Sequence, residues 1–355
     1  MARWLVTGGA GFIGSNIVHR LAADGEDVRV FDDFSSGRKE NLAGLPSARV
    51  QVLRGDLRDR KAVLKAARGC TYILHQGAIP SVPRSVRDPV ATTEVNVLGT
   101  LHVLEAARRV KPVKRVVLAS SSSIYGDSPT LPKVETMPVL PLSPYAASKA
   151  AAEGYARAFS ATHGVEVTIL RYFNVFGPRQ DPKGAYAAVV PRFFRAILRG
   201  ERPLVFGDGN QTRDFTYIDN VVEANLRAAR TPRAAGEILN IACGERVTIL
   251  GLAAMIAECL ELQTQPRLQP ARDGEVRHSL ADIRRMEAVL GFRPPIGLQQ
   301  GLGLAAEWFT RNRSGRKRKA AAGGKPSLKA KSLPEARARA EAASPGGGSG
   351  GRGAV

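Results

Sequence analysis

The stretch Thr7-Gly-Gly-Ala-Gly-Phe-Ile-Gly14 lies between a short apolar run at residues 4–6 and a helical pattern that begins near Gly11. Glycines at positions 8, 11 and 14 let the chain turn tightly, bring the backbone close to a pyrophosphate and let the helix pack on the sheet. The start of the helix then presents free N–H groups and the positive end of its dipole to the anion. This order of strand, glycine turn and helix predicts a dinucleotide-binding fold.

Outward from this turn, short β-branched runs alternate with helical patterns. Strands are expected at residues 4–6, 28–31, 50–53, 71–75, 115–119 and 165–170, and helices at 11–23, 59–68, 92–109 and 145–163. Nearly continuous apolar strands joined by helices are typical of a parallel sheet that is covered on both faces. We therefore expect an α/β fold with a Rossmann-like, doubly wound parallel sheet.

An acid follows the second expected strand at the distance that this fold requires. Asp32 stands 18 residues after Gly14, where it should bind the hydroxyls of an adenosine ribose. Its negative charge would repel a 2′-phosphate, which favours NAD over NADP. Arg38 lies near enough in the sequence to weaken that preference.

The pattern of strands weakens after Phe173, where Pro and Gly become frequent. We expect an NAD-binding domain over residues 1–173, with returning pieces at 217–230 and 237–241, and a smaller α/β substrate domain mainly over 174–310. Residues 311–355 hold 12 of the 52 Lys and Arg residues but only two of the 32 Asp and Glu residues. With few large apolar side chains, they should form a disordered basic tail. A solvated appendage is a better interpretation of this tail than a nucleic-acid contact.

The composition argues against several other classes of protein. No apolar run approaches 18 residues, so no membrane span is expected. The three cysteines, Cys70, Cys243 and Cys259, form no CxxC pair and the five histidines are scattered, so neither a disulfide framework nor a metal site is predicted. Few cysteines, together with no room for a signal peptide before the first strand, predict a cytoplasmic protein.

Tyr145 and Lys149 stand four residues apart on an expected helix, for which Ser143 is a candidate cap and Pro144 suits the first turn. Side chains at this spacing share one face of a helix. A nearby ammonium and an oxidised nicotinamide would favour the phenolate, since an opposite charge typically lowers the pKa of an acid by ~1 to 3 units. The helix N-terminus acts in the same direction. The spacing therefore predicts a tyrosine base that is activated by the lysine.

Several further markers follow the glycine turn in a fixed order: Asp32, GDL (55–57), HQGA (75–78), Asn96 with LGT after it, SSSSIYG (120–126) and YAASK (145–149). In these residues the chain resembles the extended short-chain dehydrogenase/reductases, and among them the NAD-dependent nucleotide-sugar epimerases that act on UDP-glucose or UDP-N-acetylglucosamine. The resemblance covers residues 2–309 and implies a homodimer, joined through a four-helix bundle by the helices near 92–109 and 145–163. It also implies that NAD is held by Gly8, Gly11, Phe12, Ile13, Gly14, Asp32, Asp56, Leu57, Gly77, Ala78, Asn96, Tyr145, Lys149 and Tyr172.

The same resemblance implies roles in catalysis and in binding a UDP-sugar. Ser121 would share the proton of the sugar 4-OH with Tyr145, and Lys149 would keep the tyrosine ionised. Two arginines and an asparagine match positions that hold the diphosphate, for which the arginine fork is suited. Ser279 matches a position where a bulky side chain would crowd C2, so that a serine leaves room for an N-acetyl group. The substrate-binding residues so implied are Ser81, Ser121, Ser122, Ser123, Asn174, Ala188, Val189, Arg213, Arg272 and Ser279.

The serine run carries no Asp or Glu before Ile124. The related 4,6-dehydratases and decarboxylases have an acid in this stretch for chemistry beyond C4. Its absence favours an isomerase that inverts C4 of UDP-GlcNAc/UDP-GalNAc, of UDP-glucose/UDP-galactose or of both pairs through a transient 4-keto sugar. The alternatives are a UDP-glucuronate 4-epimerase, a related nucleotide-sugar dehydratase and, less favoured, a non-catalytic NAD- or RNA-binding relative.

Overall fold

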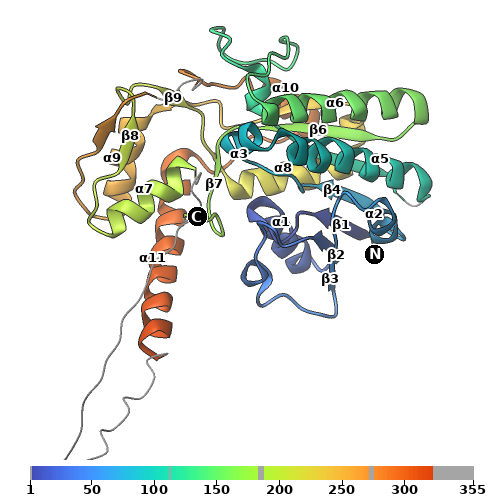
Figure 1. The fold of residues 1–355 in the computed structure, drawn as a ribbon, viewed down its shortest axis with the longest axis horizontal. Coiled ribbons are helices and arrows are strands. Elements are labelled where there is room, and N and C mark those ends of the chain that lie inside the picture. Colours follow the sequence, from blue (N-terminus) through green and yellow to red (C-terminus); the bar gives the residue numbers. More distant parts are fainter. Residues whose placement is uncertain (1, 112, 183–187, 272–275, 323–355) are drawn as a thin grey trace, which may run out of the picture. The chain divides into compact units, whose positions relative to one another are not determined.

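A parallel sheet forms the centre of the structure, which is a computed structural model. It describes residues 2–111, 113–182, 188–271 and 276–322, with residues 313–322 as helical backbone alone. Within the compact unit Met1–Arg313, seven strands pair in the order β11-β6-β5-β4-β1-β2-β3 (Figure 1). Their bounds are β1 Arg3–Thr7, β2 Asp27–Asp32, β3 Val50–Arg54, β4 Tyr72–His75, β5 Arg115–Ser121, β6 Val167–Tyr172 and β11 Ile238–Ile241. Every pairing in this sheet is parallel, which confirms the predicted doubly wound fold.

Helices cover both faces of the sheet because successive strand residues point to opposite sides. Trp4 and Val6 of β1 belong to one apolar core with helices α1 (Phe12–Ala23) and α8 (Ile218–Arg230), whereas Leu5 belongs to a second core with α2 (Arg60–Ala67), α5 (Gly99–Arg109) and α6 (Pro144–His163). Figure 1 shows α6 and α8 on opposite sides of β6.

The strand order reverses at β1, which pairs with β2 on one side and β4 on the other. The helices that follow β1 and β4, α1 and α5, cover opposite faces of the sheet. A crevice therefore opens at the carboxyl ends of these strands. The glycine turn that follows β1 lies at this point.

The helix expected at residues 92–109 is three consecutive segments in the structure. These are α4 (Pro89–Thr93), a π-helical turn η2 (Glu94–Leu98) and α5, preceded by α3 (Val82–Arg87). A π turn rotates the side chains that follow it relative to those before it, and such turns are often found at functional sites.

Shorter elements make up much of the chain after β6. Three two-stranded pairs join β7 (Val175–Phe176) with β10 (Thr216–Tyr217), β9 (Thr212–Arg213) with β12 (Val247–Thr248), and β8 (Leu204–Phe206) with β13 (Arg267–Gln269). Helices α7 (Val189–Leu198) and α9 (Ile249–Cys259) pack on each other, whereas α10 (Arg284–Leu290) packs against β11 and α8. The structure also has short turns at η1 (Lys39–Leu42), η3 (Ser122–Tyr125) and η4 (Pro232–Ala234).

The last helix extends into the first residues of the basic tail. Helix α11 runs over Leu298–Ala322, so residues 311–322 are helical. The Arg, Lys and Ala residues that make this stretch unable to form a core are at the same time strong helix formers. The remaining tail, residues 323–355, lies outside the described residues.

We predict that the tail contributes nothing to folding stability, whereas the first half of α11 is needed. Leu302, Ala305 and Phe309 are buried, and the Phe309 ring stacks on Phe194 with centroids 4.9 Å apart. A chain that ends at Arg313 should unfold at the same temperature as the full chain, whereas a chain that ends at Gly297 should lose more than about 3 kcal/mol. Urea and thermal unfolding followed by circular dichroism measure both; a clearly lower melting temperature for the chain ending at Arg313 would contradict the prediction.

Candidate active site

Backbone segments meet around the glycine turn at distances that no side chain would permit. Gly8 has φ +64°, and a Cβ there would lie 2.7 Å from the Cα of Gly77. A Cβ on Gly14 would lie 2.2 Å from the carbonyl oxygen of Gly8. The turn after β1 therefore packs directly on the start of α1 and on the loop after β4, with the first N–H groups of α1 left for a ligand.

A cavity of about 380 Å³ opens over this turn, bordered by the ends of β1, β2 and β4. Its walls combine the glycines of the turn and apolar side chains with charged and polar side chains, among them Asp32 at the end of β2. Of the residues predicted to hold a dinucleotide, those that line the cavity are Gly8, Gly11, Phe12, Ile13, Gly14, Asp32, Asp56, Leu57, Gly77 and Ala78.

Asp32 is held rigidly at the edge of this cavity. Its Oδ2 accepts a hydrogen bond from the Ala10 N–H (2.9 Å) and its Oδ1 accepts one from the Phe34 N–H (2.8 Å). Burial raises the pKa of the carboxyl, and the two backbone N–H groups oppose that shift. Arg38, which could attract a 2′-phosphate, also lines the cavity but forms an ion pair with Asp181.

Asn96 and Tyr172, also predicted to contact the dinucleotide, bond to protein groups behind the cavity. The Asn96 side-chain oxygen accepts from the Ile79 N–H (2.8 Å), and its amide nitrogen donates to the Ser148 hydroxyl (3.0 Å). The Tyr172 hydroxyl donates to the side-chain oxygen of Gln76 (3.1 Å). Through these bonds both residues fix the loop after β4.

Helix α6 begins as its sequence indicates. Ser143 is the N-cap and accepts from the Ala146 N–H (3.2 Å), with Pro144 in the first turn. The Tyr145 N–H donates to the hydroxyl of Ser85 on α3 (2.9 Å), a contact that the sequence did not suggest. One turn later, Nζ of Lys149 donates to the carbonyl of Ala119 on β5 (2.8 Å). These bonds fix the tyrosine and the lysine against two different elements.

Burial dominates the titration of both groups. It raises the pKa of Tyr145, an effect that a hydrogen bond from Ser121 only partly offsets. It lowers the pKa of Lys149 to about 8, against the attraction of Glu153. The sequence led us to expect a lowered pKa for Tyr145 beside Lys149 and an oxidised nicotinamide. In the protein alone the pKa of Tyr145 is raised, because the lysine donates to a backbone carbonyl and the phenol loses its water.

The serine run ends β5 and begins η3. Ser121 caps η3 by accepting from the Ser123 N–H (3.2 Å), and its hydroxyl also acts to lower the pKa of Tyr145. Ser122 is half-buried. The hydroxyl of Ser123 is buried, and it finds no hydrogen-bond partner among the residues that the structure describes.

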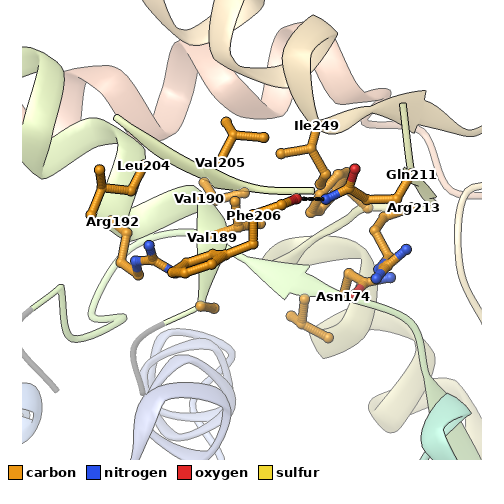
Figure 2. Close-up of a pocket in the computed structure, with 13 residues that line it drawn as sticks. Asn174, Val189, Val190, Arg192, Leu204, Val205, Phe206, Gln211, Arg213 and Ile249 are labelled. Atoms are coloured by element: carbon orange, nitrogen blue, oxygen red, sulfur yellow. Dashed lines mark hydrogen bonds between the residues drawn. The ribbon is translucent and has the colours of Figure 1, made fainter. Parts of the chain in front are cut away.

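A second cavity, of about 280 Å³, lies among β7, α7, β8 and β9 (Figure 2). Four residues predicted to bind substrate line it: Asn174, Ala188, Val189 and Arg213. Asn174 donates to the carbonyl of Asp214 (2.8 Å), and Arg213 donates to the carbonyls of Thr212 (2.9 Å) and Arg277 (3.1 Å).

Arg192, Phe206 and Gln211 are among the residues of this cavity that the sequence did not single out. Arg192 of α7 lies over the ring of Phe206, 5.5 Å from its centroid, and Gln211 donates to the Phe206 carbonyl at 2.6 Å (Figure 2). Only the fold brings them together, since 19 positions separate Arg192 from Gln211 in the sequence.

The remaining predicted substrate residues lie elsewhere. Ser81 caps α3 by accepting from the Arg84 N–H (3.2 Å). The Ser279 N–H donates to the carbonyl of Thr212, the neighbour of Arg213, at 3.0 Å. Arg272 lies outside the described residues. His278 is a packed side chain, because its Nδ1 bonds the Thr212 hydroxyl at 2.9 Å.

Within the part of the chain that the structure describes, no cluster of three His, Cys, Asp or Glu side chains could hold a metal ion. In the same part, no helix combines the length and apolarity needed to cross a membrane.

Comparisons with known proteins agree with this geometry. The model of the NAD dependent epimerase/dehydratase family matches residues 4–242. The UDP-glucose 4-epimerase of Mycolicibacterium smegmatis is 40% identical over 88% of this chain and 99% of its own length. Two solved structures are similar. The UDP-N-acetylglucosamine 4-epimerase of Methanobrevibacter ruminantium, in complex with UDP-N-acetylmuramic acid, is 38% identical with a TM-score of 0.84, and the match covers 88% of this chain and 99% of that chain. The UDP-glucose 4-epimerase of Thermus thermophilus, in complex with NAD, is 39% identical with a TM-score of 0.78, and the match covers 87% of this chain and 99% of that chain.

The glycine turn yields a test of the first cavity. Gly14→Ala should weaken NAD binding by about 1–3 kcal/mol, roughly 5- to 150-fold in Kd, because the added Cβ displaces the backbone that faces the ligand. Gly303→Ala is the matched control, since a Cβ there meets nothing within 4 Å and should leave NAD binding unchanged. Calorimetric titration with NAD measures both, and equal affinities would exclude the turn as the NAD site.

Proposed function

The chain belongs to the NAD dependent epimerase/dehydratase family, and within it we propose an NAD-dependent isomerase that inverts C4 of a UDP-hexose. The substrates are UDP-GlcNAc/UDP-GalNAc, UDP-glucose/UDP-galactose or both pairs, and a 4-keto sugar is the transient intermediate. The observation that carries this proposal is that Tyr145 shares one face of α6 with the buried ammonium of Lys149, while the Ser121 hydroxyl acts on the phenol of Tyr145. The similarity to 4-epimerases over nearly their whole lengths supports it.

The residues of the first cavity fit NAD. The glycine turn offers N–H groups at the start of α1 to a pyrophosphate, and the fixed carboxylate of Asp32 suits two ribose hydroxyls. The pairing of Arg38 with Asp181 leaves less positive charge for a 2′-phosphate. When bound there, NAD would supply the acceptor, and later the donor, of the hydride at the sugar C4.

In the proposed mechanism, proton transfer is the task of the chain itself. Tyr145, with Ser121 as relay, takes the proton of the 4-OH and later returns it. Lys149 supplies the positive charge that a phenolate needs, since burial alone opposes ionisation of Tyr145. The chain must therefore hold Lys149 charged for Tyr145 to act as a base at neutral pH.

We assign the second cavity to the UDP portion of the substrate. Arg213 and Asn174, with Arg272 as predicted from the sequence, would hold the diphosphate, and the apolar wall of Val189 and Phe206 suits a flat base. Anchoring at this end leaves the sugar free to turn between the two hydride transfers. Ser81, Ser122, Ser123 and Ser279 would face the sugar.

A dehydratase is the second candidate, because the family includes dehydratases. The serine run, residues 120–123, offers no acid for steps beyond C4, which disfavours it. A UDP-glucuronate 4-epimerase would use the same residues as an epimerase of neutral UDP-hexoses. A panel of UDP-sugars is needed to distinguish UDP-glucuronate from UDP-hexoses as the substrate.

We also propose a homodimer in the cytoplasm. An apolar surface along α4, η2, α5 and α6 exposes Val90 (67%), Leu98 (41%) and Tyr155 (42%) around a groove of about 450 Å³. Two copies that face each other there would form a four-helix bundle of α5 and α6.

The cysteines support the cytoplasmic part of the proposal. All three are unpaired, as is usual in a reducing compartment.

The catalytic proposal predicts that purified protein converts UDP-GlcNAc or UDP-glucose into its 4-epimer without net release of NADH. Tyr145→Phe removes the acid–base hydroxyl and should lower kcat by about 10²- to 10⁴-fold. Tyr155→Phe, which removes an exposed hydroxyl from the same helix, should leave kcat unchanged. Net NADH at each turnover, or a 4-keto-6-deoxy product, would contradict the proposal.

The dimer proposal predicts that Leu98→Arg halves the molar mass in solution, because a charge on the apolar surface would be buried without a partner. Leu262→Arg places the same charge on a leucine that is 44% exposed outside this surface and should leave the mass unchanged. Light scattering after size-exclusion chromatography measures the mass; a Leu98→Arg protein of unaltered mass would place the interface elsewhere.

A further inference from the structure

A buried carboxylate stands on the face of α6 that carries Tyr145 and Lys149. Glu153 follows Lys149 by four residues, as Lys149 follows Tyr145, so the three side chains form one row along the helix. Glu153 is only 4% exposed. The proposed mechanism does not use it so far.

Two side chains, from the neighbouring strands β5 and β6, donate hydrogen bonds to the Glu153 carboxylate. Its Oε1 accepts from the hydroxyl of Ser120 (2.5 Å) and from Nε of Arg171 (3.0 Å), and its Oε2 accepts from Nη2 of Arg171 (2.7 Å). Arg171 is 2% exposed and donates further to the Tyr125 hydroxyl (2.9 Å) and to the Glu135 carbonyl (3.0 Å). The ion pair is thus enclosed and fully hydrogen-bonded, the condition in which a buried pair is stable.

The bonds of Lys149 and Glu153 fall on consecutive residues of β5. Lys149 binds the carbonyl of Ala119, Glu153 binds the hydroxyl of Ser120, and Ser121 follows directly. Two successive turns of α6 therefore fix the strand end that presents the predicted catalytic serine.

Few other charges act on the buried ammonium. On its own helix, Tyr145 and Glu153 flank it; on β4, His75 lies near, but burial lowers its pKa to about 3 and leaves it neutral. On β6, Arg171 is held by Glu153, and the neighbouring hydroxyls of β5 carry no charge. Glu153 is thus the anion that opposes the loss of the Lys149 proton on burial.

We propose that Glu153, paired with Arg171, is a positioning residue that keeps the Lys149 ammonium charged and aligns the strand end bearing Ser121. The effect of Glu153 on catalysis rests on the proposed function, whereas the contacts of Glu153, Arg171 and Lys149 do not. A merely structural ion pair would stabilise the fold without setting the charge of Lys149.

The test is a pH titration of Lys149 in the NAD-bound protein, read from the ¹³Cε resonances of labelled lysine and assigned by its absence in Lys149→Met. In Glu153→Gln the midpoint should fall by about 1 unit, since an anion is lost and Arg171 is left unpaired. Glu135→Gln is the matched control, because it removes a half-buried carboxylate of the residue whose backbone carbonyl binds Arg171, and this carboxylate does not act on Lys149. Its midpoint should equal that of the wild type.

Kinetics give a second reading. The alkaline limb of kcat should move to lower pH in Glu153→Gln alone, by the same amount as the resonance. Should Glu153→Gln fail to fold, Glu153→Gln/Arg171→Met removes both charges without leaving one bare and should still lower the midpoint. An unmoved midpoint in the folded variant, or an equal shift in Glu135→Gln, would overturn the proposal. If the wild-type protein has no epimerase activity but the Lys149 midpoint still falls in Glu153→Gln, this proposal would be upheld and the proposed function refuted.

Discussion

The ammonium of Lys149 is almost enclosed by protein and donates at 2.8 Å to the carbonyl of Ala119. A buried cation is unfavourable unless oxygen atoms and an opposite charge compensate for the lost water. Both compensations constrain the fold, because the carbonyl must come from the end of β5 and the anion from the next turn of α6. The position of Tyr145, one turn before the lysine, follows from the same alignment of helix and strand.

The sheet supplies the second constraint. With all strands parallel, their carboxyl ends share one edge, and the reversal of order at β1 opens that edge beneath the glycine turn. The loop after β4 can approach Gly8 only because both contacting residues, Gly8 and Gly77, lack side chains. The dinucleotide cavity, the serine run at the end of β5 and the start of α6 are therefore consequences of a single topology.

Local signals made much of this predictable. Strand patterns, the glycine spacing, the Ser143 cap and the four-residue spacing of Tyr145 and Lys149 each depend on neighbours in the sequence. Contacts between distant segments could not be predicted in this way. No residue near Glu153 in the sequence indicates that Arg171 pairs with it, although an arginine within the apolar run of β6 could have indicated a buried charge. The π turn at Glu94–Leu98 and the small strand pairs after Phe173 also escaped prediction, because two-residue strands and a single irregular turn leave almost no periodicity. The raised pKa of Tyr145 depends on burial, which no spacing reveals.

The central claim is that Tyr145 and Lys149 act together on a sugar held beside NAD. A crystal structure of the protein with NAD and a UDP-hexose tests it most directly. The Tyr145 oxygen should lie within about 3 Å of the sugar O4, with Ser121 bonded to the same oxygen and the Lys149 ammonium turned toward the nicotinamide ribose. A sugar C4 beyond the reach of Tyr145, or a lysine directed away from the dinucleotide, would contradict the mechanism.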